Sequence, residues 1–334
     1  MKILVTGTAG FIGFSTALEL LRRGNEVVGV DNHNDYYDIQ LKEDRVAELS
    51  QFKNYQHHRI DISHDSLKEI AESFLPETIV NLAAQAGVQY SLKNPKAYVE
   101  ANIMGFMNIL EISKEINIKH LVYASSSSVY GANTSMPFSE DIAACHPLSI
   151  YASSKRANEL MAHTFSYIHR LPSTGLRFFT VYGPWGRPDM ALFKFTKSIL
   201  NNDPIDVYNN GEHSRDFTYI DDIVQGIISA IDKPPLEDEG WSGKDPNPST
   251  SFCPFKIYNI GNGSPVKLMK FIELIEKELG KKAEINFLPL QIGDVPETHA
   301  DISSITRDLN YSPSTSTDLG IKKFIEWYKD YYKV

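Results

Sequence analysis

The sequence contains little cysteine, no long apolar run and no excess of positive charge. Its two cysteines, Cys145 and Cys253, lack metal-ligand spacing. We therefore expect neither a disulfide framework nor a metal site, as in a protein of the reducing cytoplasm. No segment approaches the roughly 20 apolar residues of a membrane span, and no secretory signal is evident. The net charge of −9 argues against binding to nucleic acid or an anionic membrane, because the field of the whole protein repels polyanions.

Short apolar runs alternate with helical patterns through the first half of the chain. Lys2–Gly7 and Glu26–Asp31 predict buried strands, and the segment 13–24 between them predicts a helix that ends at a glycine. Further strands are expected at 57–62, 78–84, 120–126 and 173–183. Alternation of this kind implies parallel strands joined by right-handed crossovers, which together form a doubly wound α/β sheet.

The second half of the 334 residues is more mixed. Amphipathic helices are expected at 221–232 and 264–279. We therefore expect residues 1–183 to form a Rossmann-type nucleotide-binding domain. Residues 184–334 are expected to form mainly a smaller, mixed α/β substrate-binding domain, allowing for the chain to cross back to the sheet around 215–260.

A glycine-rich turn, "VTGTAGFIG", joins the first predicted strand to the first helix. It contains Gly7, Gly10 and Gly13. Side chains at these positions would keep the backbone away from a bound pyrophosphate, whose charge then rests on the helix N-terminus. The spacing is G-x-x-G-x-x-G and not the commoner G-x-G-x-x-G, and such glycines also occur in turns that bind nothing. The motif predicts a dinucleotide site, with a bare turn as the alternative.

An acidic residue at the end of the second strand strengthens this prediction. Asp31 stands where a carboxylate binds the ribose hydroxyls of adenosine and repels a 2′-phosphate. Neither Asn32 nor His33 offers an arginine to neutralise such a phosphate, so NAD is favoured over NADP. Asp61, at the end of the third predicted strand, is a weaker candidate for the adenine edge. A capping or turn role is the alternative for both aspartates.

The segment "YASSK" places Tyr151 and Lys155 one helical turn apart on one face of a helix. This helix follows the predicted strand that ends in the serine run Ser125–Ser128. A lysine ammonium beside a phenol, helped by the positive charge of an oxidised nicotinamide, lowers the pKa of the phenol. The phenol can then take a proton from a sugar hydroxyl. The alternative is an exposed Tyr–Lys pair on a helix surface.

Together these motifs resemble the extended short-chain dehydrogenase/reductase family. The resemblance includes "RFFTVYGPWGRPDMA" at 177–191 and extends over nearly the whole chain, through 211–222 and 293–301. Within the nucleotide-sugar-modifying branch, the chain is most similar to the UDP-glucuronate 4-epimerases. The resemblance implies bound NAD, a UDP-sugar substrate and a homodimer that pairs through the helix at 98–113 and the helix beginning at Tyr151. From the sequence alone, the apolar faces of these helices could also be ordinary sheet-packing surface.

The resemblance also implies which residues form the site. Tyr151, Lys155 and Ser126 are the catalytic residues, and Ser126 is expected to hydrogen-bond the reacting hydroxyl beside Tyr151. Arg215 is expected at the pyrophosphate of the substrate and Asp294 at its uridine ribose. The implied cofactor-binding set is Gly7, Gly10, Phe11, Ile12, Gly13, Asp31, Asn32, Asp61, Ile62, Leu82, Ala83, Ala84, Tyr151 and Lys155. The implied substrate-binding set is Ser126, Ser127, Ser128, Thr180, Arg187, Arg215 and Asp294.

Two serines discriminate between the activities of this branch. Similar sugar-nucleotide dehydratases carry an Asp–Glu pair before V-Y-G and similar UDP-glucuronate decarboxylases carry a glutamate there, whereas this chain has Ser127 and Ser128. A hydroxyl cannot act as the acid or base of an elimination near neutral pH, so dehydration is not expected. Oxidation at C4 of a glucuronate gives a β-keto acid, whose carboxylate the two serines, Thr180 and Arg187 are candidates to restrain. The alternatives are an ordinary strand threonine and a surface arginine.

We therefore expect an NAD-dependent isomerase that epimerises C4 of UDP-glucuronate to give UDP-galacturonate through a transient 4-keto sugar. The alternative enzymes are a UDP-glucuronate decarboxylase and a 4-epimerase of neutral UDP-hexoses, and the alternative outside enzymes is an NAD-binding sensor or scaffold. Two positions depart from the family pattern: Gln89, where arginine is usual, and Asn81, where histidine is frequent. Gln291 replaces an arginine of galactose epimerases but is common in the glucuronate branch.

Overall fold

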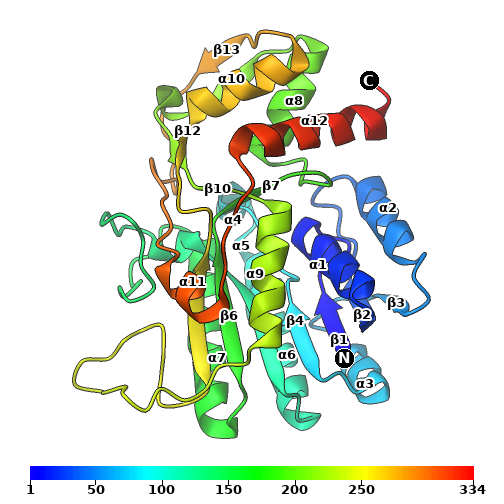
Figure 1. Ribbon diagram of the computed structural model, residues 1–334, viewed down its shortest axis with the longest axis vertical. Coiled ribbons are helices and arrows are strands. Elements are labelled where there is room, and N and C mark those ends of the chain that lie inside the picture. Colours follow the sequence, from blue (N-terminus) through cyan, green and yellow to red (C-terminus); the bar gives the residue numbers. More distant parts are fainter.

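A seven-stranded parallel sheet forms the centre of the computed structural model, which describes residues 1–334. Its strands lie in the order β11-β6-β5-β4-β1-β2-β3 (Figure 1). Their bounds are β1 (Lys2–Thr6), β2 (Glu26–Asp31), β3 (Tyr55–Arg59), β4 (Thr78–Asn81), β5 (His120–Ser126), β6 (Ser173–Phe178) and β11 (Phe255–Ile260). The order reverses between β1 and β4, which places a crevice at their carboxyl ends, the usual ligand position in such sheets. The predicted fold class is confirmed.

Helices cover both faces of this sheet (Figure 1). One face carries α1 (Phe11–Arg22), α2 (Ile39–Leu49) and α9 (Ile220–Asp232). The other face carries α3 (Ser66–Phe74), α6 (Gly105–Glu115) and α7 (Ile150–His169). The chain enters α6 through α4 (Val88–Lys93), α5 (Pro95–Tyr98) and the π-helical η1 (Val99–Met104). No helix combines the length and the apolar character that crossing a bilayer requires.

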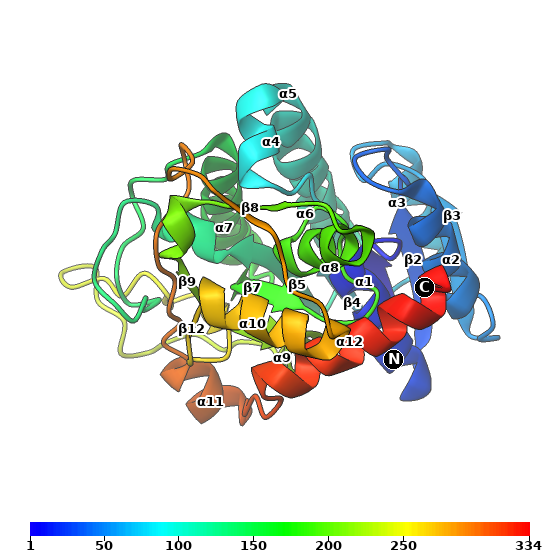
Figure 2. The same cartoon turned by 90° about the horizontal axis from the view of Figure 1, so that it is seen from above.

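A smaller lobe stands on the carboxyl end of the sheet (Figure 1). It contains α8 (Ala191–Asn201), α10 (Leu268–Leu279) and α12 (Thr317–Tyr332), which share a core with α1 and α9. Three short strand pairs complete it: β7 (Thr180–Tyr182) with β10 (Phe217–Tyr219), β8 (Ile205–Val207) with β13 (Ile285–Phe287), and β9 (Ser214–Arg215) with β12 (Val266–Lys267). The remaining elements are η2 (Ser127–Tyr130), η3 (Asn209–Gly211) and α11 (Ser303–Leu309). In the view from above, α4 and α5 lie on one side of the molecule, and α10 and α12 lie on the opposite side (Figure 2).

The second half of the chain also builds part of the central sheet. β11 pairs with β6 and forms the edge strand, while α9 packs against α1 and β5. The chain therefore leaves the sheet after β6, forms part of the smaller lobe, returns through α9 and β11, and leaves again. Segments of the smaller lobe are thereby anchored on both sides to the scaffold that carries the glycine turn.

Two expectations about secondary structure are wrong. The segment 173–183 forms β6 and β7, which belong to different sheets, because Phe179 donates its N–H to Ile260 and Thr180 donates to Asp216. The helix expected at 264–279 begins only at α10, because β12 pairs with β9 and holds the preceding residues extended. The hydrophobic pattern continues without a break through each segment. The sequence therefore gives no local sign of the residue at which the backbone changes its hydrogen-bond partner.

Candidate active site

One cavity of about 610 Å³ opens at the carboxyl ends of the central strands. This volume lies within the roughly 300–1,000 Å³ that is typical of small-molecule sites. The cavity is lined by every predicted cofactor- and substrate-binding residue except one: Gly7, Gly10, Phe11, Ile12, Gly13, Asp31, Asn32, Asp61, Ile62, Leu82, Ala83, Ala84, Ser126, Ser127, Ser128, Tyr151, Lys155, Thr180, Arg187 and Asp294. The exception, Arg215, lines an adjoining cavity of about 120 Å³. Ser127, Ser128, Thr180 and Asp294 line both cavities. The predicted residues lie together, and their individual roles stay predictions.

The glycine turn between β1 and α1 is packed too tightly for side chains at two of its three glycines. Gly7 has a φ of +80°, and a Cβ there would lie 2.7 Å from the backbone nitrogen of Ala83. A Cβ on Gly13 would lie 2.0 Å from the Gly7 carbonyl oxygen. The backbone of the chain itself therefore requires these two glycines, in addition to any requirement set by a ligand.

Gly10 is the N-cap of α1 and lines the cavity together with the first residues of the helix, Phe11 and Ile12. A Cβ on Gly10 would have one close neighbour in the protein, the Gly7 carbonyl oxygen at 3.0 Å. The first N–H groups of a helix lack partners within it, and the helix dipole favours negative charge there. This end of the cavity fits the pyrophosphate of NAD.

Asn81, one of the two departures from the family pattern, is hydrogen-bonded to the end of β1, where the glycine turn begins. Its side-chain oxygen accepts the hydroxyl of Thr6 at 2.7 Å, and the Thr6 oxygen accepts the N–H of Ala83 at 3.1 Å. Asn81 is buried. It therefore fastens the end of β4 to the end of β1 and does not line the cavity.

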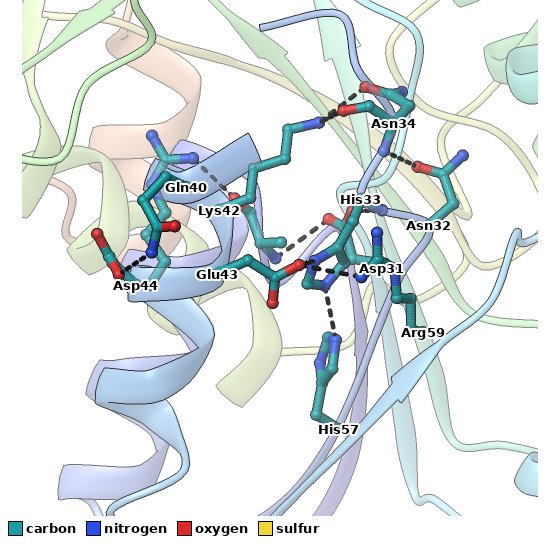
Figure 3. A network of polar contacts seen from close by, with 12 residues as sticks. Asp31, Asn32, His33, Asn34, Gln40, Lys42, Glu43, Asp44, His57 and Arg59 are labelled. Atoms are coloured by element: carbon teal, nitrogen blue, oxygen red, sulfur yellow. Dashed lines mark hydrogen bonds and ion pairs between the residues drawn. The ribbon is translucent and has the colours of Figure 1, made fainter. Parts of the chain in front are cut away.

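Asp31, at the end of β2, is held by backbone hydrogen bonds to both of its carboxylate oxygens. The N–H of Ala9 donates to Oδ2 at 3.1 Å and the N–H of His33 donates to Oδ1 at 2.9 Å (Figure 3). Asn32 donates its side-chain amide to Asp61 at 2.7 Å, which ties the ends of β2 and β3 together. Both aspartates line the cavity. An acidic ribose site of this kind suits NAD and disfavours a 2′-phosphate.

Lys42, a cation that sequence analysis missed, lies on the same wall. It donates to the backbone and side-chain oxygens of Asn34 at 2.6 and 2.7 Å (Figure 3). His33, in contrast, is buried and contacts His57 and Glu43, each at 2.9 Å. The ammonium of Lys42 is therefore engaged within its own loop, and the His33 ring is not part of the cavity wall.

Tyr151 stands in the first turn of α7. Ser149 caps this helix by accepting the N–H of Ala152 at 3.1 Å. Lys155 is buried and donates its ammonium to the backbone oxygen of Ala124 in β5 at 2.9 Å. Burial lowers the pKa of Lys155 to about 8. The pair therefore lies where α7 packs on β5, with both side chains at the cavity wall.

The expected effect of Lys155 and an oxidised nicotinamide on the pKa of the Tyr151 phenol stays a prediction, and the structure shows how the chain's own groups act on it. Burial raises the pKa of Tyr151, and the groups that partly lower it are Ser126 and the charge of Arg187. The i, i+4 spacing places Tyr151 and Lys155 on one helix face, but the contact with β5 decides which acceptor the ammonium reaches. In this structure that acceptor is a carbonyl oxygen and not the phenol.

The four serines of the run have different environments. Ser125 is buried and donates to Glu159 at 2.6 Å, within a buried ion-pair network. Ser126 accepts the N–H of Ser128 at 3.1 Å and so caps η2. Ser127 and Ser128 line both cavities. The Ser125 hydroxyl is thus bound within the scaffold, although Ser125 lines the larger cavity together with the other three serines.

Arg187, on the loop after β7, is bound by an acidic residue that sequence analysis missed. Its Nε and Nη2 donate to the two carboxylate oxygens of Asp189 at 3.0 and 2.6 Å. Tyr36 donates its hydroxyl to the same carboxylate at 3.1 Å. Burial opposes both charges, but their pairing outweighs it and holds the pKa of Asp189 below, and that of Arg187 above, the ordinary value. Asp189 belongs to the "GRPDMA" motif and could have been noticed, whereas Tyr36 carries no sequence signal.

Arg215 and Asp294 form an ion pair of 2.9 Å where the two cavities meet. Arg215 also donates to the carbonyl oxygen of Pro296 at 2.9 Å. Gln89, the second departure from the family pattern, lines the larger cavity and donates to the carbonyl oxygen of Ile292 at 3.0 Å. Gln89 thereby ties α4 to the loop that carries Asp294.

The chain is similar to known proteins in sequence and in structure. The model of the NAD dependent epimerase/dehydratase family matches residues 3–261. The chain is 56% identical over 334 residues to Protein CapI of Staphylococcus aureus, covering 100% of both chains. It is 47% identical over 339 residues to UDP-glucuronate 4-epimerase 2 of Arabidopsis thaliana, covering 100% of this chain and 77% of the relative. Among solved structures, it is similar to the UDP-glucuronic acid 4-epimerase from Bacillus cereus in complex with UDP-glucuronic acid and NAD. The TM-score is 0.89 and the identity 34%, over 99% of this chain and 100% of that one.

Proposed function

Because this chain belongs to the NAD dependent epimerase/dehydratase family, we propose that it interconverts UDP-glucuronate and UDP-galacturonate by inverting C4. The observation that carries this choice is the makeup of the cavity wall. Ser127, Ser128 and Arg187 line the same cavity as Tyr151, and no carboxylate stands at the two positions before Val129 where an elimination would need one.

The acid–base part of the reaction belongs to Tyr151. NAD, when bound, supplies hydride transfer at C4 in both directions, so the reaction has no net redox change. Tyr151 takes the proton of the C4 hydroxyl as the 4-keto sugar forms and returns it to the epimer. Ser126 lowers the pKa of Tyr151, which opposes the effect of burial. The buried ammonium of Lys155 adds positive charge beneath the same wall.

The substrate must turn over between the two hydride transfers while its nucleotide stays in place. We assign the UDP portion to Arg215 and Asp294, and their ion pair where the two cavities meet supports this assignment. The 4-keto sugar then turns about its pyrophosphate linkage and presents its opposite face.

The uronate carboxylate needs a restraint of its own. A 4-keto uronate is a β-keto acid and loses CO₂ when its carboxylate is free to adopt a productive orientation. Arg187 supplies a planar, charge-assisted fork, and Ser127, Ser128 and Thr180 supply short polar side chains on the same wall. This set favours return of the ketone as an epimer over release of a pentose.

We also propose a homodimer and a cytoplasmic location. Apolar side chains are exposed along η1 and α7: Val99 at 50%, Met104 at 59%, Leu160 at 55% and Ile168 at 60%. Such a stripe on neighbouring helices suits pairing with a second copy. Both cysteines are free thiols, which suits a reducing compartment. Light scattering of the purified protein measures the oligomeric state, and a monomer at micromolar concentration would contradict the dimer.

Product analysis tests the proposed reaction. The purified protein is incubated with UDP-glucuronate and, in parallel, with UDP-glucose, and the products are followed by NMR. UDP-galacturonate as the main product supports the proposal. A UDP-pentose with CO₂ would indicate a decarboxylase instead, and turnover of UDP-glucose alone an epimerase of neutral hexoses. No turnover of either substrate by protein that contains NAD would favour a sensor or scaffold.

A further inference from the structure

The guanidinium of Arg187 is bound along one edge and leaves a second edge without a partner in the chain. Its Nε and Nη2 donate to Asp189 at 3.0 and 2.6 Å, while Nη1 makes no hydrogen bond to protein. An arginine side chain can bind a planar carboxylate through either of two such forks. Asp189 uses the fork of Nε and Nη2, so the fork of Nη1 and Nη2 is available to another carboxylate.

Tyr36 holds Asp189 from a distant part of the chain. Its hydroxyl donates to Oδ2 of Asp189 at 3.1 Å across a separation of 153 residues. The Tyr36 ring lies 4.9 Å from the ring of Tyr90, and a Cβ on Gly87 would lie 2.5 Å from the Tyr36 hydroxyl oxygen. Burial raises the pKa of Tyr36 to about 12, so the phenol remains a hydrogen-bond donor. Tyr36 is therefore packed in place and can orient the carboxylate.

We propose that Tyr36 and Asp189 are positioning residues that hold Arg187 by one edge, so that its other edge receives the carboxylate of the uronate. This inference rests on the proposed function. The three side chains line the same cavity as Tyr151. They also connect the loop that follows Asp31, at the cofactor end, to the loop that follows β7, at the sugar end.

The charge balance of this arrangement predicts how it selects a substrate. Arg187 and Asp189 together carry no net charge, and each side chain is 23% exposed. A lone, partly buried guanidinium would be left uncompensated whenever a neutral sugar occupied the site. The Arg187–Asp189 pair selects by geometry instead. The planar carboxylate of a uronate can accept hydrogen bonds from both Nη1 and Nη2, whereas the hydroxymethyl group of a neutral hexose cannot. Affinity for the uronate should therefore depend on Asp189, and affinity for a neutral UDP-hexose should not.

Binding of two ligands to the NAD-containing protein tests this inference. In a Tyr151→Phe background, which stops turnover, calorimetry measures the Kd of UDP-glucuronate and of UDP-glucose. Asp189→Asn places an amide where the guanidinium needs two acceptors. We expect it to raise the Kd of UDP-glucuronate about tenfold and to change that of UDP-glucose by less than about twofold. Tyr36→Phe removes only a hydroxyl and should act in the same direction by about threefold. With Tyr151 restored, both variants should release a larger share of pentose.

Asp35→Asn is the matched control, because it removes the same charge from an exposed residue beside Tyr36. Unchanged or tighter binding of UDP-glucuronate by Asp189→Asn would overturn the inference, since Asp189 would then be a competitor of the substrate. Equal losses for both ligands would also overturn it, because they indicate a general structural role. If Asp189→Asn does not fold, Tyr36→Phe is judged by the same criteria. Failure of the unmodified protein to epimerise UDP-glucuronate overturns the proposed function itself, and is seen without any variant.

Discussion

The cofactor end and the sugar end of the cavity are built in different ways. At the cofactor end backbone groups fix the shape of the wall: Gly7 and Gly13 leave no room for a Cβ, and two backbone N–H groups hold the Asp31 carboxylate. At the sugar end the surface is mainly side chain, and ion pairs hold its two arginines: Arg187 to Asp189, and Arg215 to Asp294. The central sheet therefore determines the shape of the cofactor end. The shape of the sugar end depends on side-chain rotamers and on the pairing of charges.

The two ends of the cavity differ in how easily a substitution alters them. A backbone surface alters only when the strands and turns that carry it move, whereas a side-chain surface alters with a single substitution. The cofactor end can therefore stay the same while the sugar end determines the fate of the keto sugar. Tyr151 stands between the two ends, and variants on each side of it separate their contributions.

The largest effect is expected from Tyr151→Phe, which removes the acid–base group and leaves both ends intact. We expect kcat to fall about 1,000-fold, because a positioned general base contributes about 100- to 10,000-fold. The NAD content of the purified protein should not change. Rates are measured by NMR of the product, with Tyr167→Phe, 54% exposed on the same helix, as the control. Activity within about tenfold of the unmodified protein would remove Tyr151 from the proposed role.

The next effect, about thirtyfold, is expected from Arg187→Ala and should be confined to the sugar end. KM for UDP-glucuronate should rise by this factor and the share of pentose product should increase, since the carboxylate loses its charge-assisted fork. NAD content and KM for any neutral UDP-hexose that turns over should not change. Arg22→Ala, at an exposed position of α1, is the control. Unchanged affinity together with an unchanged product ratio would exclude Arg187 from substrate binding.

The smallest effect concerns stability at the cofactor end. Burial lowers the pKa of Lys155 from 10.5 to about 8, so the fold favours the neutral amine. Below pH 8 the folded chain carries a buried ammonium at full cost, and this cost disappears as the pH rises to 10.5. Lys155→Met should therefore lose activity yet gain about 1–2 kcal/mol of unfolding free energy at pH 7.

Urea unfolding at pH 7 and at pH 10 measures this gain, which should shrink at the higher pH as the native lysine loses its proton. Lys53→Met, at an exposed position, should show no such pH dependence. A methionine variant that is less stable than the unmodified protein at pH 7 would contradict the expected direction. It would mean that the hydrogen bond from Lys155 to Ala124 outweighs the burial of the charge.

Local patterns were sufficient for the scaffold and for the residue types of the site. The alternation of apolar runs and helices predicted the doubly wound sheet, because each strand and each crossover helix has its own hydrophobic period. The glycine turn, the acid after β2 and the Tyr–Lys pair are each contained within a few residues. Their side chains meet in one cavity because the carboxyl ends of parallel strands lie at one edge of the sheet.

Contacts between distant segments decided the rest, because the sequence does not state which partner a polar group finds. Only the fold shows that Lys155 reaches the carbonyl oxygen of Ala124, and that the chain changes sheets at Phe179. The sequence by itself determined the fold class, the family and nearly half of the residues that line the larger cavity. The tertiary structure decided how those residues are charged and held, including the pairing of Arg187 with Asp189 and Tyr36. Charge and orientation depend on burial and on partners brought together by packing, and no short stretch of sequence contains both.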